Sequence, residues 1–138
     1  MPQSRSVIVN ESQQLNCPFC EPDPERVLHS DSLAKIINDG YPISPGHMLI
    51  IPCAHHATIF DAPPEHQAHI FGLINEAKEI IYRSFTPDGF NIGINSGKAA
   101  GQTIPHAHIH VIPRYIGDVK DPRGGVRWII PTKARYWE

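Results

Sequence analysis

The sequence predicts a domain that combines several short strands with a single long helix. The 138 residues are enough for one hydrophobic core. Apolar residues recur at three-to-four spacing over residues 64–85 alone, while shorter apolar or alternating runs occupy much of the remainder. The 14 prolines fall mostly between these runs and therefore mark many sharp element boundaries.

The expected elements follow in order with turn signals between them. Strands are predicted at residues 27–28, 33–37, 47–53, 90–95 and 103–113. The helix at 64–85 follows Asp61, which is able to cap it, and has proline in its first turn. A glycine-bearing turn at 96–101 joins the last two strands into a hairpin. We expect one domain over 1–138, with a polar arm at 1–16 and a tail at 115–138.

Composition excludes several classes of function. A formal net charge of −2 gives no general attraction to nucleic acid or to an anionic membrane. The longest apolar run, at 48–54, is far too short to span a bilayer. Residues 1–16 show no basic start and no apolar core of a secretion signal. Together with a Cys-x-x-Cys pair and one further cysteine, this predicts a cytoplasmic protein.

The most informative stretch places His106, His108 and His110 on alternate positions between apolar residues. Such alternation predicts a strand with three imidazoles on one face. A polar face without chemistry, a metal centre and nucleophilic catalysis are the three interpretations. A single strand does not easily surround a metal ion, whereas an imidazole attacks phosphorus well. The preceding turn, with Asn95 and Thr103, offers donors for a phosphate and favours the third interpretation.

The pair Cys17 and Cys20 is open to zinc binding, redox chemistry or no role as buried free thiols. A redox pair belongs at the head of a helix, and Pro18-Phe19 followed by Glu21-Pro22 predicts none. Structural zinc needs two further ligands, and His55, His56 and His106 are available. Cys53, on a predicted strand, is expected to lie in the core.

Two segments, 101–103 (Gly-Gln-Thr) and 106–114 (His-Ala-His-Ile-His-Val-Ile-Pro-Arg), resemble the histidine triad (HIT) superfamily of nucleotide hydrolases and transferases. The resemblance extends upstream through Asp39, the Pro-Gly-His at 45–47, the Ile-Pro at 51–52 and His55, and covers about residues 17–115. It implies an α+β fold, with a five-stranded antiparallel sheet, one long helix and short helical turns. It also implies a homodimer.

The resemblance assigns roles to individual residues. It implies that His108 is the nucleophile, forming a nucleotidyl-histidine that water hydrolyses, that His110 contacts the phosphoryl group, and that His47 supports the triad. The substrate residues implied are Asp39 and Asn38 at the ribose, Ile37 and Tyr41 at the base, and Asn95, Gln102 and Thr103 at the phosphate. A plain turn residue is the alternative for Asp39.

Members of the family with this cysteine pair resemble zinc proteins. Carried over, the ligands of a structural zinc are Cys17, Cys20, His55 and His106, with His56 as the competitor of His55. His106 is then structural, and the other two triad histidines are chemical. His29, His66 and His69 are assigned to the surface or to packing.

The expected function is cleavage of the α-phosphate linkage in a purine nucleotide, either a dinucleoside polyphosphate or a nucleoside phosphoramidate. A hexose-1-phosphate nucleotidyltransferase-like activity is a second enzymatic possibility. A nucleotide-binding, zinc-stabilised adaptor with little or no catalysis is the alternative from another class. In the tail, Asp118, Asp121, Arg123 and Arg127 form either a specificity rim or a solvated loop, and Trp128 or Trp137 either stacks on a base or packs.

Overall fold

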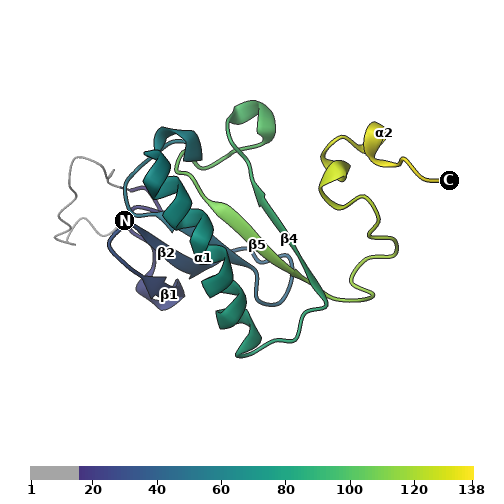
Figure 1. Ribbon diagram of the computed structural model, residues 1–138, viewed down its shortest axis with the longest axis horizontal. Helices are drawn as coiled ribbons and strands as arrows, with labels where there is room; N and C mark the ends of the chain where they lie inside the picture. Colours follow the sequence, from purple (N-terminus) through teal and green to yellow (C-terminus); the bar gives the residue numbers. More distant parts are fainter. Residues whose placement is uncertain (1–15) are drawn as a thin grey trace.

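The computed structural model describes residues 16–138, so the arm expected at 1–16 lies, apart from Asn16, outside the described residues. Its centre is a five-stranded antiparallel sheet in the order β1-β2-β3-β5-β4 (Figure 1). The strands are β1 (Val27–Ser30), β2 (Ala34–Asn38), β3 (Met48–Pro52), β4 (Gly89–Ile94) and β5 (Ile109–Arg114). The helices are α1 (Pro64–Tyr82) and α2 (Pro131–Ala134). Short 3-10 turns are η1 (Pro24–Arg26), η2 (Ile59–Asp61), η3 (Lys98–Ala100) and η4 (Gly125–Ile129). The expected α+β architecture is confirmed.

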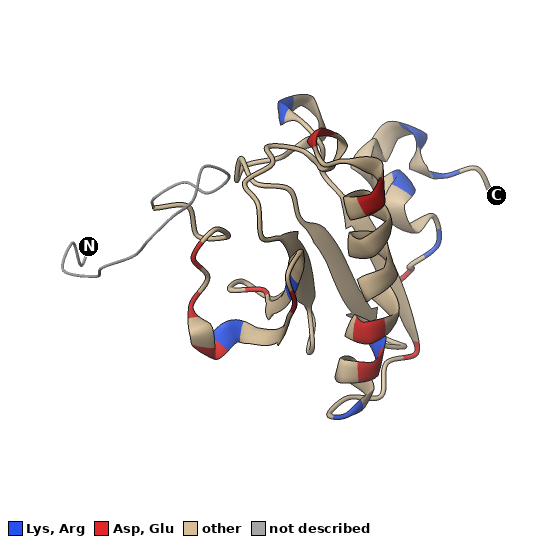
Figure 2. Cartoon of the chain, turned by 60° about the vertical axis from the view of Figure 1, so that its left-hand side comes forward, with Lys and Arg blue, Asp and Glu red and all other residues tan. Residues whose placement is uncertain are grey.

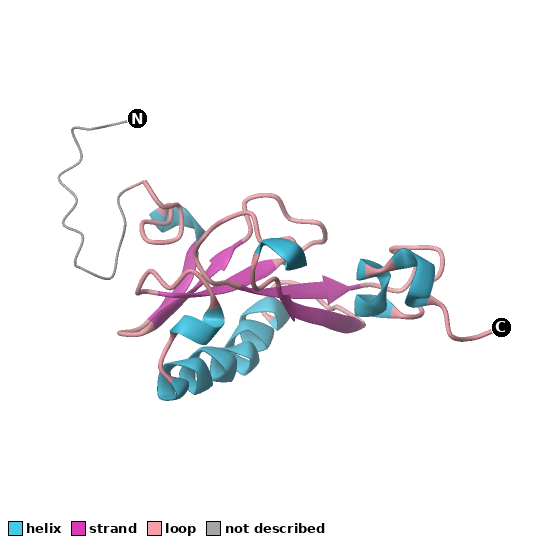
Figure 3. Ribbon diagram, turned by 90° about the horizontal axis from the view of Figure 1, so that it is seen from above, coloured by secondary structure: helices cyan, strands magenta, loops and turns pink. Residues whose placement is uncertain are grey.

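Helix α1 covers one face of the sheet, as the view from above shows (Figure 3). Its apolar positions repeat at helical spacing and point into a common core with β2, β3 and β5. The buried helix residues are Ile70, Leu73, Ala77, Ile80 and Ile81. Among residues 16–138, no helix is long and apolar enough to cross a membrane.

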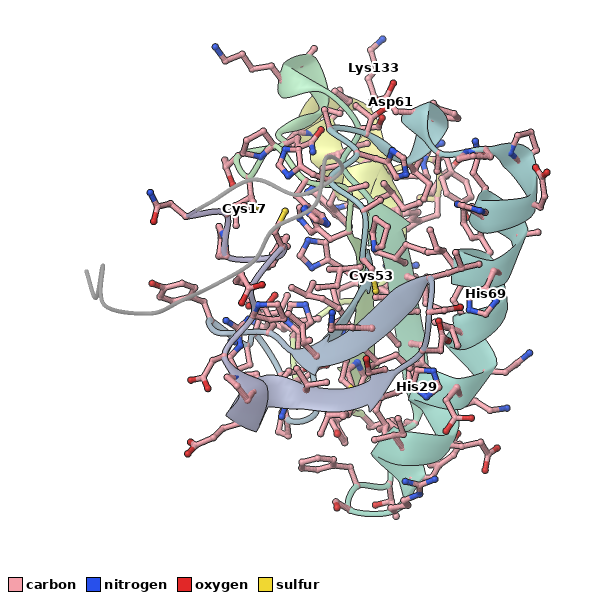
Figure 4. The ribbon with its side chains drawn as sticks, turned by 90° about the vertical axis from the view of Figure 1, so that its left-hand side faces the viewer. Cys17, His29, Cys53, Asp61, His69 and Lys133 are labelled. Carbon is pink, nitrogen blue, oxygen red and sulfur yellow. The ribbon has the colours of Figure 1, made fainter. Side chains whose placement is uncertain are left out.

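A second, smaller core lies on the opposite face of the sheet. There Cys17, Phe19 and Cys20 pack against Ile37, Leu49 and Ile51, and Cys17 lies on the side of the sheet away from α1 (Figure 4). We call residues 17–20 the cysteine knuckle. Because α1 and the knuckle cover the two faces, all five residues of β3 are buried, and the strand is apolar throughout.

The strand predicted at 103–113 is wrong over its first half, because β5 begins only at Ile109. Pro105 has no N–H for a ladder. The next two backbone donors are used outside the ladder, since His106 N–H donates to the Ile104 carbonyl and Ala107 N–H to that of His56. His106 and His108 therefore lie on an irregular segment that leads into the strand.

The predicted helix is also shorter than expected at its C-terminal end. It stops at Tyr82, and the amides of residues 83–85 close the last turn onto the Ile80 and Ile81 carbonyls. Asp61 does not cap it: Pro63 is the N-cap, and the Asp61 carboxylate accepts from the Thr58 backbone and hydroxyl within η2. The helix therefore ends at Tyr82, whereas apolar spacing alone predicts that it continues to residue 85.

The tail after β5 forms a compact unit in which basic residues group around η4 and α2 (Figure 2). The guanidinium carbon of Arg123 lies 4.6 Å from the centre of the Trp137 ring, and that of Arg127 lies 4.8 Å from the Tyr136 ring. Arg127 also donates to the carbonyls of residues 133 and 134. Asp118 binds Arg114, and Asp121 binds Arg123. The charged residues expected to form either a specificity rim or a solvated loop are therefore engaged within residues 114–138.

Asp31 fastens the β1–β2 turn to α1. One carboxylate oxygen accepts from His29 on β1 and from His69 on α1, each at 2.9 Å. The other accepts from the backbone N–H groups of residues 33 and 34. Figure 4 labels the two histidines. Partial burial alone raises the pKa of Asp31, but the hydrogen bonds, that from His29 first, outweigh it and hold the pKa well below its usual value. His29 and His69, expected at the surface or in packing, hold this carboxylate.

We expect Asp31→Asn to lower the free energy of unfolding by about 1–2 kcal/mol, since an amide has a single acceptor oxygen and its nitrogen cannot accept from the imidazoles or from the backbone N–H groups that it faces. Thermal melts at pH 7 should show a fall in Tm of roughly 5 °C. Asp121→Asn, which alters only an exposed pair with Arg123, is the matched control and should shift Tm by no more than about 2 °C. Equal shifts in Tm for the two variants would contradict a stabilising role for the hydrogen bonds of Asp31.

Candidate active site and metal centre

His108 is held in one orientation by the backbone. Its Nδ1 lies 2.8 Å from the carbonyl oxygen of His106, which accepts hydrogen bonds only. The proton of the neutral ring is therefore on Nδ1, and Nε2 carries a free lone pair. The residue is 8% exposed, and its ring contacts those of Phe19 and His110, with centroids 5.0 Å and 5.2 Å away. The arrangement supplies an oriented nucleophilic nitrogen.

A second chain of hydrogen bonds fixes the protons of His47 and His110. The Ile43 N–H donates to Nδ1 of His47 at 3.2 Å. The proton of His47 is then on Nε2, which lies 3.0 Å from Nδ1 of His110 and 3.3 Å from a carboxylate oxygen of Asp39. With Nδ1 of His110 as acceptor, its own proton is on Nε2. His110 thus presents a donor next to the ring of His108.

The imidazole rings of His47 and His110 are both neutral near pH 7. Burial lowers the pKa of His47, and the nearby Asp39 carboxylate opposes this only in part. Burial also lowers the pKa of His110, helped by the neighbouring imidazoles of His108 and His47 and opposed by Asp39. Neutral rings are what the proton assignment above requires.

The cysteine knuckle meets two histidines in a cluster with the geometry of a four-ligand metal site. The ligand atoms of Cys17, Cys20, His55 and His106 all lie within 4.8 Å of one another. The two Nδ1 atoms of the histidines are 3.2 Å apart, and the sulfur-to-nitrogen distances include 3.2, 3.4 and 3.6 Å. Tetrahedral zinc with its usual bond lengths needs about 3.3 Å between nitrogens and about 3.6 Å between sulfur and nitrogen. The residues present therefore fit zinc.

A hydrogen bond to the backbone orients His106 in this cluster. Its Nε2 donates to the Pro52 carbonyl at 2.8 Å, so the lone pair lies on Nδ1, toward the thiols. His56 lies outside the cluster; its carbonyl accepts from the N–H of Ala107. Cys53 is partly exposed, with its sulfur 3.7 Å from the ammonium of Lys35, so its expected place in the core is wrong.

The metal-free protein should lose stability as the pH falls toward 4. Burial lowers the pKa of His106 from 6.5 to about 4, outweighing the hydrogen bond to the Pro52 carbonyl. Between these values the unfolded chain binds a proton that the native chain does not, so the free energy of unfolding falls by about 3 kcal/mol from pH 6.5 to pH 4 through this residue. Urea titrations of the chelated protein measure this slope. His66→Gln should retain it and His106→Gln should reduce it; a flat profile in the wild-type chain would contradict it.

The residues expected around the substrate lie at two sites near the triad. One carboxylate oxygen of Asp39 accepts from the Tyr41 N–H, while the other faces His47 and His110. Ile37, expected beside the base, is fully buried in the second core and offers no surface to a ligand. Tyr41 is exposed, and Asn38 follows Ile37 at the end of β2 with its side chain half-buried.

The loop before the triad is braced by Gln102. Its side-chain oxygen accepts from the Gly97 N–H, and its amide nitrogen donates to the carbonyls of Ala57 and Ile104. These bonds occupy the side chain expected at the phosphate, so its direct effect is on the shape of the loop. Asn95 and Thr103 are exposed on either side of that loop.

Sequence reasoning missed Phe19. It is 4% exposed and lies between the two cysteines of the knuckle, with its ring edge-on to those of His106 and His108. The signal in the sequence was an aromatic residue between two candidate metal ligands, since a residue in that place must lie near the cluster that those ligands form.

Comparisons with known proteins agree with this geometry. The family described as HIT domain matches residues 21–117. The chain is 36% identical to adenylylsulfatase HINT3 of Arabidopsis thaliana, over 78% of this chain and 56% of that protein. It is 33% identical to the asymmetrical bis(5'-nucleosyl)-tetraphosphatase of Schizosaccharomyces pombe, over 72% and 55%. The chain thus spans just over half the length of these two curated relatives. A zinc-bound histidine triad family protein from Mycobacterium smegmatis is 35% identical, with a TM-score of 0.67 over 78% of this chain and 84% of that structure.

Proposed function

This chain belongs to the HIT domain family, and from that premise we propose that it is a nucleotide hydrolase or transferase acting through His108. The substrate is a nucleoside phosphate derivative, a dinucleoside polyphosphate or a nucleoside phosphoramidate, cleaved at its α-phosphate. The observation that carries the proposal is the hydrogen bond from His108 Nδ1 to the His106 carbonyl, which leaves the lone pair on Nε2.

The reaction proceeds in two steps on the same nitrogen. Nε2 of His108 attacks the α-phosphorus, a P–N bond forms, and the bond to the leaving group breaks. The imidazole then carries positive charge, which the carbonyl at Nδ1 stabilises. Water attacks the phosphorus from the vacated side, the P–N bond breaks with return of its electron pair to Nε2, and a proton passes to solvent. His110 Nε2–H donates to a phosphoryl oxygen in both steps.

Residues around the triad hold the substrate. Asp39 and Asn38 at the end of β2 bind the ribose hydroxyls, and the exposed Tyr41 flanks a purine base. Asn95, Thr103 and the backbone at 101–102 bind the phosphate, on a loop that the Gln102 side chain keeps in shape. The name of each curated relative supports this class of substrate, since one is an adenylylsulfatase and the other acts on a dinucleoside tetraphosphate.

The four-residue cluster binds a structural zinc ion in this proposal. Two thiolates and two neutral imidazoles balance the charge of the ion, and the bound metal supplies a rigid link between the knuckle and the sheet. We also propose that the protein is cytoplasmic, since the thiols must stay reduced to bind the metal. We propose in addition that it forms the homodimer that the family resemblance implies.

The test is an activity screen combined with detection of the intermediate. The purified protein is mixed with diadenosine polyphosphates, an adenosine phosphoramidate and adenylyl sulfate, and release of AMP is followed. Mass spectrometry of the quenched protein should show an acid-labile, base-stable nucleotidyl adduct on His108. Saturable nucleotide binding without turnover and without adduct would overturn the enzymatic proposal and support the adaptor.

A further inference from the structure

The geometry points to Phe19 as a positioning residue that links the cysteine knuckle to the nucleophile. This inference rests on the proposed function of His108, since it concerns how that ring is held. Phe19 is buried on the same face of the sheet as the histidines. Its ring centroid lies 5.0 Å from that of His108 at an interplanar angle of 63°, and 5.8 Å from that of His106 at 86°. One aromatic ring thus contacts a metal-site histidine and the nucleophile together.

Hydrogen bonds within the cysteine knuckle fix the backbone position of Phe19. The Cys17 sulfur accepts from the Cys20 N–H at 3.4 Å, and the Cys17 carbonyl accepts from the Glu21 N–H at 3.2 Å. These bonds close a tight turn with Phe19 inside it. Because the flanking cysteines meet His55 and His106, the position of Phe19 is set from both ends by the same cluster.

The His108 ring must be held in one orientation. A neutral imidazole has two tautomers and two ring orientations, and only one combination leaves Nε2 free to attack. The bond from Nδ1 to the His106 carbonyl selects it, and the rings of Phe19 and His110 limit rotation of the imidazole away from that bond. His106 therefore influences the nucleophile in two ways, through its carbonyl and through the Phe19 ring that both histidines contact.

The test compares Phe19→Ala with Phe19→Leu by nitrogen-15 NMR of the imidazoles in the metal-loaded protein without substrate. In the wild-type protein His108 should show the single tautomer protonated on Nδ1. In Phe19→Ala both nitrogen shifts of His108 should move toward the values of a tautomer mixture, and Phe19→Leu, which refills most of the space, should restore the wild-type pattern. Val27→Ala, which removes another side chain packed on the second core, is the matched control and should leave His108 unchanged.

Kinetics supply the second measurement. With a nucleotide that is turned over, kcat of Phe19→Ala should fall by roughly tenfold to a hundredfold while KM stays within about twofold, because the defect is in aiming the nitrogen. Zinc content and melting curves must match the wild type; if Phe19→Ala does not fold, Phe19→Val replaces it with the same expected direction. Unchanged nitrogen shifts of His108 in a folded, metal-loaded variant would overturn the inference. A complete lack of turnover in the wild type would overturn the proposed function instead, and the NMR comparison would still decide the role of Phe19.

Discussion

Replacing His108 with alanine is expected to lower kcat/KM by at least about 10³-fold, since the step that forms the P–N bond loses its nucleophile. Neither of the other two triad rings has the same preparation: His110 presents its proton rather than its lone pair, and His106 directs its lone pair at the thiols. A neighbour is therefore unable to replace it. Steady-state rates of AMP release measure the effect, and the nucleotidyl adduct should disappear with the activity.

The matched control for this variant is His66→Ala. His66 is a half-buried residue near the start of α1, and its loss should change kcat/KM by no more than about twofold. Turnover that persists in His108→Ala with an intact fold would show that the nucleophile has been wrongly assigned.

Loss of the proposed zinc ion is expected to have the largest effect on stability. Binding to a site that exists only in the folded chain adds directly to the free energy of unfolding, so Cys20→Ala should lower it by about 4 kcal/mol. For a chain of this size that corresponds to a fall in Tm of roughly 15 °C. Elemental analysis should find one zinc ion per wild-type chain and a much smaller content in the variant.

Cys53→Ala separates this effect from the loss of a thiol in general. Cys53 lies outside the cluster and is partly exposed, so this variant should keep its zinc and most of its Tm. Equal zinc content in Cys20→Ala and the wild type, or equal melting of chelated and untreated protein, would contradict a structural metal at the knuckle.

The sequence predicted the strands, the long helix and their order because the spacing of apolar residues and the positions of proline and glycine are local properties of the chain. It overestimated β5, since the alternation of His106, Ala107 and His108 describes which way side chains point and not where backbone donors go. The side chains do alternate, with Ala107 in the core under α1 and the two histidines on the other side. The ladder starts later because the amides before it bind the carbonyls of Ile104 and His56.

The candidate site divides in the same way. The four residues expected at the metal do converge. They could be predicted because the family resemblance supplied a ligand set that spacing alone leaves open. The bracing role of Gln102, the burial of Ile37 and the contact of Phe19 with His108 were not predicted. Each depends on contacts between residues distant in the chain, and a single sequence carries no direct signal for them.

Because both faces of β3 are covered, the proposed zinc ion also matters for chains that fail to bind it. A strand in an ordinary two-layer protein turns alternate residues to water, whereas Leu49 and Ile51 meet the knuckle and Met48 and Ile50 meet the helix. If the knuckle is displaced from the sheet, the aliphatic side chains that it covers in the middle of the sheet become exposed to water. We therefore expect zinc depletion in the cell to lower the amount of intact protein first, through precipitation and proteolysis.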